Sequence, residues 1–551
     1  MTNPDRFSTN RRALIGGATA AVAAAGILRA DQLALAAPVS SSAKLAAGFQ
    51  EGDNVIIIGT LGEAATINGF LPNDTEAYWR CKLLFEQFVR TDGVSYEPTP
   101  GPGIVESWEL DELSYTFKIH DNATFSDGTD LTADDASFTI HGILNPETAS
   151  PNASKFSSVA GAEEYVAGSA DSVSGIEVVD SKTIKITLAT PDASFLYNLR
   201  YVFVVPKAQL EGKNLGTDDW FKNPVGAGPF KFDSWSVGGD FVASKNEHYY
   251  QEGKPAIDGL IHRVIADANT LALALQTGEI DGSVYPSPAL RSQIEQNSDM
   301  TFTLPPFTYP DGWTFNHRNE WLAKPEVRQA IVHAIDVSQF AADSLLGLGE
   351  PAVGPIAPGN WAFDSTLAAL PYDPDKSREL LASVNFPEDV SFRASVNIGN
   401  VLREDWLVYS QQALAEVGIT LDAQPQEFAT LIEAVSVSRD FDMVGIPFSG
   451  VTADPGELYE QFSTDGSQND SGYSNPDLDA LLAQARQELD IDTAKGIYSE
   501  IQKILIEESV NHFAWYRPFL NVVHSKVQGL TPSNLEEGIF YSLEDASITA
   551  M

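Results

Sequence analysis

The sequence predicts a mixed α/β protein with more than one domain, and three observations lead to this prediction. The chain has 551 residues, more than a single hydrophobic core usually holds. Strand-like patterns predominate up to about residue 310, and apolar residues at helical spacing predominate beyond it. Hydrophobic residues make up 43% of the chain, which is typical of a globular protein and excludes wholesale disorder.

Short runs of β-branched and aromatic residues predict the strands. Residues 55–59 form a continuous apolar run, which is typical of a strand buried on both faces. Residues 114–120 alternate with a period of two, as a half-buried strand does. A hairpin is expected over residues 176–188, and further strands are expected at residues 241–244 and 261–264.

Capping residues and prolines predict the helices. Asp373-Pro374 and Asn475-Pro476 each place a capping side chain before a proline, whose fixed φ suits the first helical turn. Pro325 marks another helix start. An earlier helix is expected over residues 75–90, where Cys81 is expected to be a buried structural thiol. Because Cys81 is the single cysteine, no intrachain disulfide is possible.

The charge balance excludes several classes of function. The chain carries 76 acidic and 34 basic residues, a formal net charge of −42. Binding to nucleic acid or to anionic lipid needs a basic surface, so we expect no nucleic-acid partner. The acids are scattered through turns, caps and helix faces. They therefore indicate a hydrated surface suited to high salt and do not imply a cationic ligand.

Residues 1–36 have the pattern of an export signal. Arg11-Arg12 precedes the small apolar run of residues 13–28, and Ala34-Leu35-Ala36 follows as a cleavage site. The paired arginines resemble a twin-arginine signal. The run is too short and too rich in Ala and Gly to span a bilayer well, and no later segment is long and apolar enough. We expect a flexible leader at residues 37–51 and a mature chain that is periplasmic or otherwise extracytoplasmic, without membrane insertion.

No catalytic or metal-binding constellation is visible. The eight histidines show no zinc-binding spacing, and the chain lacks a Gly-x-Ser-x-Gly elbow and a phosphate-binding loop. We therefore predict no enzymatic activity, no metal and no cofactor. Paired acids such as Asp134-Asp135 are plentiful, which leaves open a secreted hydrolase that uses two carboxylates in a cleft.

A series of motifs stands in a fixed order along the chain. Its members are Gly103–Glu109, Tyr115–Lys118, Ala123–Asp135, Asn223–Phe232, Lys245–Tyr250, Leu275–Asp281, Val327–Ile331, Asp454-Pro455 and Tyr473–Pro476. In this order they resemble the family 5 extracellular solute-binding proteins, the peptide-, nickel- and oligosaccharide-binding components of ABC importers. The resemblance covers residues 52–545.

The resemblance implies an α/β fold of the periplasmic-binding-protein type, with two lobes, a hinge and an extra inserted domain. Residues 52–96, 216–305 and 516–551 would form lobe I, residues 97–215 the inserted small domain, and residues 306–515 lobe II. It also implies that a monomer traps a solute when the lobes close and delivers it to permease subunits of an ABC transporter. A sensing or chaperone module on the same fold remains an alternative, as does the hydrolase.

Ligand contacts are expected from loops at the cleft, because aromatic faces can stack on a sugar or a peptide and an asparagine can bind a hydroxyl or amide. The candidates are Tyr78, Trp313, Asn316, Trp361, Phe448 and Ser449. Peptide-binding members hold the peptide's amino terminus with an aspartate shortly before the Asp-Pro pair, and here Val451 occupies that position. This departure disfavours a dipeptide and favours an opine, a glycoside or another small polar solute. The expected ligand is thus peptide-like, an opine or an oligosaccharide.

Overall fold

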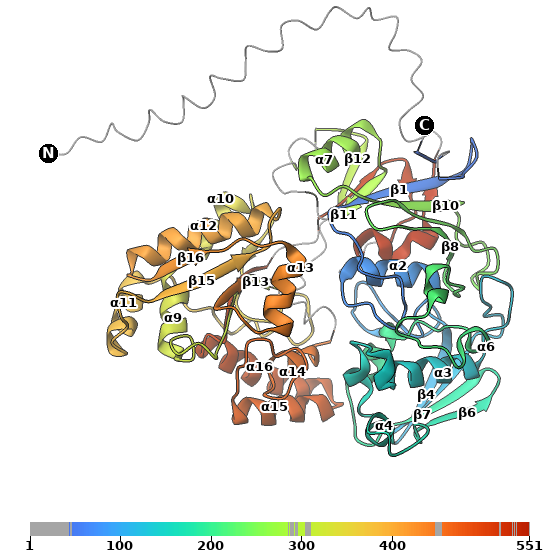
Figure 1. Ribbon diagram of the computed structural model, residues 1–551, viewed down its shortest axis with the longest axis horizontal. Helices are drawn as coiled ribbons and strands as arrows, with labels where there is room; N and C mark the ends of the chain where they lie inside the picture. Colours follow the sequence, from blue (N-terminus) through green and yellow to red (C-terminus); the bar gives the residue numbers. More distant parts are fainter. Residues whose placement is uncertain are drawn as a thin grey trace, which may run out of the picture.

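The computed structural model describes residues 43–44, 47–284, 286, 291, 296–303, 310–446, 454–516, 520–531, 533, 535 and 537–549. The predicted export signal, residues 1–36, lies outside the described residues, as does most of the leader expected at residues 37–51. The described chain forms two bodies that lie side by side (Figure 1). We use lobe I for the described residues of 52–96, 216–303 and 520–549, inserted domain for 97–215, and lobe II for 310–516. The exact boundaries stay a prediction.

A seven-stranded sheet forms the centre of lobe I, in the order β12-β19-β11-β1-β10-β9-β8. Its strands are β1 (Val55–Thr60), β8 (Phe230–Ser234), β9 (Phe241–Lys245), β10 (Gly259–Val264), β11 (Gly282–Val284), β12 (Met300–Thr303) and β19 (Asn521–His524). Strand β1 is parallel to both neighbours and all six of its residues are buried, which confirms the predicted buried strand. The strands predicted at 241–244 and 261–264 are confirmed as β9 and β10.

Helix α2 (Thr75–Phe85) is shorter than the predicted helix over residues 75–90. It ends because Glu86 adopts a φ of 62°, outside the helical region. The last turn is packed directly against the backbone of another segment: an added Cβ at Gly226 would come within 2.1 Å of the Leu84 carbonyl oxygen. The Gly-Ala-Gly stretch at residues 226–228 therefore serves close packing on α2. Helix α7 (Ala268–Thr277) also belongs to lobe I.

The inserted domain is built on a four-stranded antiparallel sheet in the order β4-β5-β7-β6. Its strands are β4 (Val105–Asp111), β5 (Ser114–Ile119), β6 (Ile176–Asp180) and β7 (Thr183–Thr187), and its helices are α3 (Ala133–Leu144), α4 (Ala162–Val166), α5 (Phe195–Asn198) and α6 (Lys207–Leu210). Both the strand at 114–120 and the hairpin are confirmed. The hydrophobic core is continuous with that of lobe I, since Phe117 and Ile56 belong to one buried cluster. The inserted domain and lobe I are therefore packed as one body.

Lobe II has its own six-stranded sheet, in the order β14-β18-β13-β17-β15-β16. Its strands are β13 (Pro310–Phe315), β14 (Glu350–Pro351), β15 (Ser391–Val396), β16 (Thr420–Ala423), β17 (Met443–Gly445) and β18 (Asn511–Tyr516). The core is a separate cluster that contains Trp313, Trp406 and Trp515. The chain passes from lobe I to lobe II between β12 and β13, and returns between β18 and β19.

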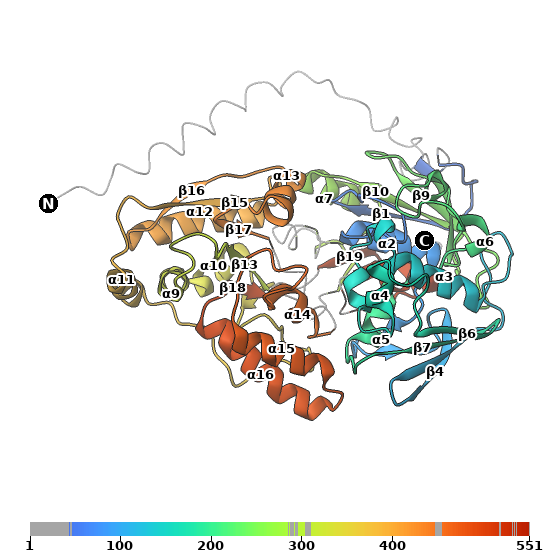
Figure 2. The same ribbon diagram turned by 60° about the horizontal axis from the view of Figure 1, so that its bottom comes forward.

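Helices surround the lobe II sheet (Figures 1 and 2). They are α9 (Pro325–Ala334), α10 (Val337–Ser344), α11 (Pro374–Ser383), α12 (Val401–Glu416), α13 (Phe428–Ile432), α14 (Glu457–Phe462), α15 (Pro476–Gln487) and α16 (Ile491–Glu507). The three predicted starts at Pro325, Pro374 and Pro476 are confirmed. Asn475 caps α15 as expected, with its side-chain oxygen accepting from the backbone N–H of Asp477 at 3.0 Å. Short strands β2 (Arg90–Thr91), β3 (Pro98–Thr99), β20 (Val527–Gln528) and β21 (Ser547–Ile548) complete the fold.

Candidate functional site

A cavity of about 170 Å³ lies between the two bodies, and three distant parts of the chain form its wall. Lobe I contributes the start of α2, the inserted domain contributes two segments, and lobe II contributes α14. The lining residues are Pro72, Asn73, Asp74, Thr75, Tyr78, Pro151, Asn152, Lys155, Tyr201, Glu457, Glu460 and Gln468. Their mixture of aromatic, amide and charged side chains suits a polar ligand.

The lobe I wall is held rigid by helix capping. Asp74 is the N-cap of α2, and its carboxylate accepts from the backbone N–H of Ala77 at 2.7 Å and of Ala65 at 3.1 Å. Burial raises the pKa of Asp74, although the two backbone N–H groups oppose the shift. Tyr78, one turn further on, accepts from the side-chain amide of Gln87. Both polar groups are thus already engaged by the protein.

Cations and aromatic rings alternate on the inserted-domain wall. The Lys155 ammonium lies over the Tyr201 ring, 4.8 Å from its centroid. The buried Arg200 guanidinium lies behind the cavity, 5.1 Å from the Tyr201 centroid and 5.3 Å from that of Tyr78. Such contacts stabilise a partly desolvated cation. This wall therefore carries positive charge and presents an aromatic surface.

The lobe II wall carries negative charge. Glu457 and Glu460 lie in the first turn of α14, where the helix dipole favours carboxylates. Glu460 accepts from the Ser467 hydroxyl at 2.7 Å and lies 3.8 Å from the Arg486 guanidinium. Lys155 and these two carboxylates line the same cavity from opposite bodies. A solute in the cavity would meet both signs of charge.

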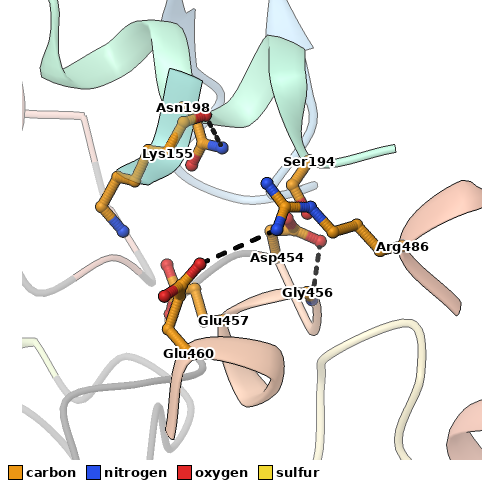
Figure 3. A pocket seen from close by; sticks show the side chains of 8 residues that line it. All are labelled: Lys155, Ser194, Asn198, Asp454, Gly456, Glu457, Glu460 and Arg486. Carbon is orange, nitrogen blue, oxygen red and sulfur yellow. Dashed lines mark hydrogen bonds and ion pairs between the residues drawn. The ribbon is translucent and has the colours of Figure 1, made fainter. Parts of the chain in front are cut away.

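A smaller cavity of about 20 Å³ adjoins the first and shares Lys155, Glu457 and Glu460 with it (Figure 3). Its volume matches a single water molecule. Asp454 is buried beside it, and its carboxylate accepts from the backbone N–H of Gly456 at 3.0 Å. Burial raises the pKa of Asp454, opposed by the Ser194 hydroxyl and the Gly456 N–H. The acid of the Asp-Pro motif therefore shapes the loop before α14.

Of the residues predicted to bind ligand, Tyr78 lies at the cavity, and its contact with a ligand stays a prediction. Trp313 is buried in the lobe II core, where its indole N–H donates to the Ser410 hydroxyl at 3.0 Å. Asn316 is also buried, and its amide donates to the Phe441 carbonyl at 2.7 Å. The structure places both residues within lobe II, where they pack or brace loops and line neither cavity, and their contact with a ligand stays a prediction.

Of the remaining candidates, one is described by the structure and three are not. Trp361 packs on Tyr498 in the core beneath α15 and α16, with ring centroids 5.6 Å apart, and lines neither cavity. Phe448, Ser449 and Val451 lie outside the described residues, so their roles stay predictions. Lys155, Tyr201, Glu457 and Glu460 were missed because no local pattern marks them. Only the adjacent Asp454-Pro455 motif pointed to that part of lobe II.

The described residues give no support for a metal site, a membrane-spanning helix or a reactive cysteine. Among those residues, no group of three or more His, Cys, Asp or Glu side chains is arranged to hold a metal ion. No helix within them is long and apolar enough to cross a bilayer. Cys81 is buried as predicted, and burial raises the pKa of its thiol far above the ordinary value, so it is an inert thiol at neutral pH.

Two lobes that enclose a polar cavity define a binding protein that closes around its ligand. Residues 99–470 match the family described as bacterial extracellular solute-binding proteins, family 5, and the chain belongs to this family. The match confirms the resemblance of the ordered motifs. The superposition of the chain on solved binding proteins confirms the two-lobed α/β fold.

The chain is similar along most of its length to three binding proteins. It is 27% identical over 496 residues to the oligopeptide-binding protein AppA of Bacillus subtilis, covering 87% of this chain and 89% of AppA. It is 28% identical over 466 residues to the glutathione-binding protein GsiB of Pectobacterium atrosepticum, covering 81% of this chain and 85% of GsiB. Among solved structures, AgaA of A. tumefaciens R10 in complex with agropinic acid superposes with a TM-score of 0.79 and 25% identity, covering 90% of this chain and 99% of AgaA.

Proposed function

We propose that the protein captures a small polar solute in the cavity between its lobes and delivers it, as a monomer, to the permease of an ABC importer. The observation that carries this proposal is the cavity wall, to which lobe I, the inserted domain and lobe II all contribute charged or polar side chains. A solute bound there contacts both bodies at once, so binding favours the closed arrangement. Genes for permease and ATPase subunits beside this gene would support an importer over a sensor or chaperone.

We propose no catalytic role for the cavity carboxylates. Asp74 is engaged as the N-cap of α2, and Glu460 is engaged by Ser467 and by Arg486. A hydrolase needs an acid whose carboxyl group is available for proton transfer. The positions of Asp74 and Glu460 instead favour binding over hydrolysis.

The ligand is a peptide-like compound or an opine, in preference to a neutral oligosaccharide. Lys155 faces the cavity from one body, and Glu457 and Glu460 face it from the other. A ligand with both a carboxylate and an amino group can interact with the charges on both walls, whereas a neutral sugar makes no charge-assisted contact with either. The names of AppA, GsiB and AgaA's bound ligand agree with this class.

A thermal-shift screen of the mature protein tests this class. We expect short peptides such as glutathione, or opines, to raise the unfolding temperature, because a ligand at 100 times its Kd adds about 2.7 kcal/mol of stability. Titration calorimetry should then give a Kd at or below about 1 µM. Lys155→Met should weaken binding about tenfold, whereas Lys222→Met, at an exposed position outside the cavity, should not. Stabilisation by neutral oligosaccharides alone, or by no compound, would contradict the proposal.

We further propose that Arg11-Arg12 directs export of the chain by the twin-arginine route, which leaves the mature protein outside the cytoplasm. Replacing both arginines with lysine in the full-length chain is expected to leave uncleaved precursor in the cytoplasm. Cell fractionation with an antibody against the mature part measures this. Normal processing of the double-lysine variant would exclude the route.

A further inference from the structure

Beside the ligand cavity, the inserted domain touches lobe II through a contact centred on Arg486. The backbone N–H of Ala193 donates to the Arg486 carbonyl at 2.8 Å. The Arg486 guanidinium donates to the Ser157 hydroxyl at 3.4 Å and lies 3.6 Å from the Asp192 carboxylate. Figures 1 and 2 both show the end of α15 beside the inserted domain. Because the inserted domain shares its core with lobe I, this contact joins the two bodies that close on a ligand.

Groups of the inserted domain itself hold the Asp192 carboxylate in place. The Ser158 hydroxyl donates to its carboxylate at 2.6 Å, and the backbone N–H of Ser194 donates at 3.0 Å. The Asp192 side chain is 1% exposed, so its charge needs a counter-ion nearby. Arg486 supplies that positive charge from the opposite body, and its guanidinium also stacks over the Tyr459 ring at 5.0 Å. Opening the lobes would remove the counter-ion from a preorganised carboxylate.

The two bodies also approach each other closely at position 456. An added Cβ at Gly456 would come within 2.0 Å of the Ser194 hydroxyl oxygen, which belongs to the inserted domain. The φ of Gly456 is −58°, which any residue can adopt, so a side chain there is limited by its neighbours, the Ser194 hydroxyl and, at 2.8 Å, the Asp454 carboxylate. Figure 3 shows Ser194, Asp454 and Gly456 close together in the lining of the small cavity.

We propose that these residues form a latch, defined as Asp192 and Ser194 of the inserted domain with Gly456 and Arg486 of lobe II. The latch holds the two bodies closed, and Arg486 is a positioning residue that raises ligand affinity without lining the larger cavity. Apparent affinity scales with the population of the closed form, so loss of the latch weakens binding even though no ligand contact is removed. The effect on affinity rests on the proposed function, whereas the effect on closure does not.

The closure is tested on ligand-stripped protein by spin-label distance measurement. Labels at Val166→Cys and Val437→Cys report on the inserted domain and lobe II, since the two positions are 45% and 73% exposed. Cys81 is buried and stays unlabelled. We expect a short-distance population in the parent protein, a smaller one in Gly456→Ala, and its recovery in Gly456→Ala/Ser194→Ala. The single variant Ser194→Ala is the control, because it removes the interaction of the Ser194 hydroxyl with Asp454 without adding a Cβ at position 456.

The contribution of the Arg486 charge to the latch is tested by Arg486→Met. The matched control is Arg378→Met, on the exposed face of α11. Arg486→Met should lengthen the label distance, and Arg378→Met should leave the distance unchanged. With a ligand from the screen, Arg486→Met should raise Kd about tenfold, mainly through faster dissociation. A parent protein without a short-distance population, or Arg486→Met distances equal to the parent's, would overturn the latch. If the thermal-shift screen finds no ligand, the label distances still test the latch. The latch and the proposed binding function can therefore fail independently.

Discussion

Arg90→Met is expected to lower the free energy of unfolding by about 3–5 kcal/mol, because it would strand two buried carboxylates. The Arg90 guanidinium forms an ion pair with Glu86 at 2.6 Å and another with Glu544. All three side chains are buried, so neither carboxylate would regain full hydration after the substitution. Urea unfolding of the mature protein measures the change.

The same substitution is expected to loosen the C-terminal segment. Glu544 lies in the 3₁₀ helix Gly538–Asp545, and Lys82 on α2 is 3.2 Å from Glu537 just before that helix. These ion pairs join α2 and β2 to residues more than 450 positions away in sequence. Hydrogen exchange should therefore accelerate in residues 537–549 of Arg90→Met before it accelerates in lobe II.

Lys118→Met provides the control for Arg90→Met. Lys118 pairs with Glu106 at 2.9 Å, but both side chains are nearly half exposed. Exposed pairs contribute about 0–1 kcal/mol, because water already solvates both charges. Equal losses of stability in the two variants would show that the buried network contributes no more than a surface ion pair.

Arg328→Met is expected to destabilise lobe II by a similar amount, about 3–5 kcal/mol. The buried Arg328 guanidinium donates to four backbone carbonyls, those of Leu322 at 2.8 Å, Ala323 at 3.0 Å, Glu508 at 2.8 Å and Ser509 at 2.9 Å. Burial lowers the pKa of Arg328 to about 10, which still leaves it charged at neutral pH. The variant would leave these carbonyls without their donor at the point where α9 meets the end of α16.

Arg328→Lys separates charge from geometry. A lysine keeps the charge but cannot reach four carbonyls with a planar fork of donors, so it should recover only part of the lost stability. Arg378→Met, which removes an exposed pair with Asp375 at 2.6 Å, should cost less than about 1 kcal/mol. Urea unfolding compares the three variants. If Arg328→Met were no worse than Arg378→Met, the buried donor fork would not be a stabilising element.

Elements with local signals were predicted well because the forces that form them act within a few residues. Pro374 and Pro476 begin helices in the structure, since a fixed φ and a capping side chain need no distant partner. The continuous apolar run of β1 required burial on both faces, and the structure provides it. The prediction of a helix over residues 75–90 is wrong at its C-terminal end, because the helix stops at Phe85. There Glu86 leaves the helix and binds Arg90, and Glu544 from the far end of the chain completes the network.

The sequence by itself determined the family, the mixed α/β class, and the helix starts and strands that local patterns specify. The tertiary structure alone decided which side chains meet at the cavity. Trp313 is a residue type that often contacts ligands, but it lies in the core of lobe II. Lys155 and Glu460 stand in no recognisable sequence pattern, yet they line the same cavity from opposite bodies. The physical reason is range: capping and periodicity are encoded within a turn or two, but a cavity wall assembled from residues 72–78, 151–201 and 457–468 exists only after long-range packing has placed two bodies together.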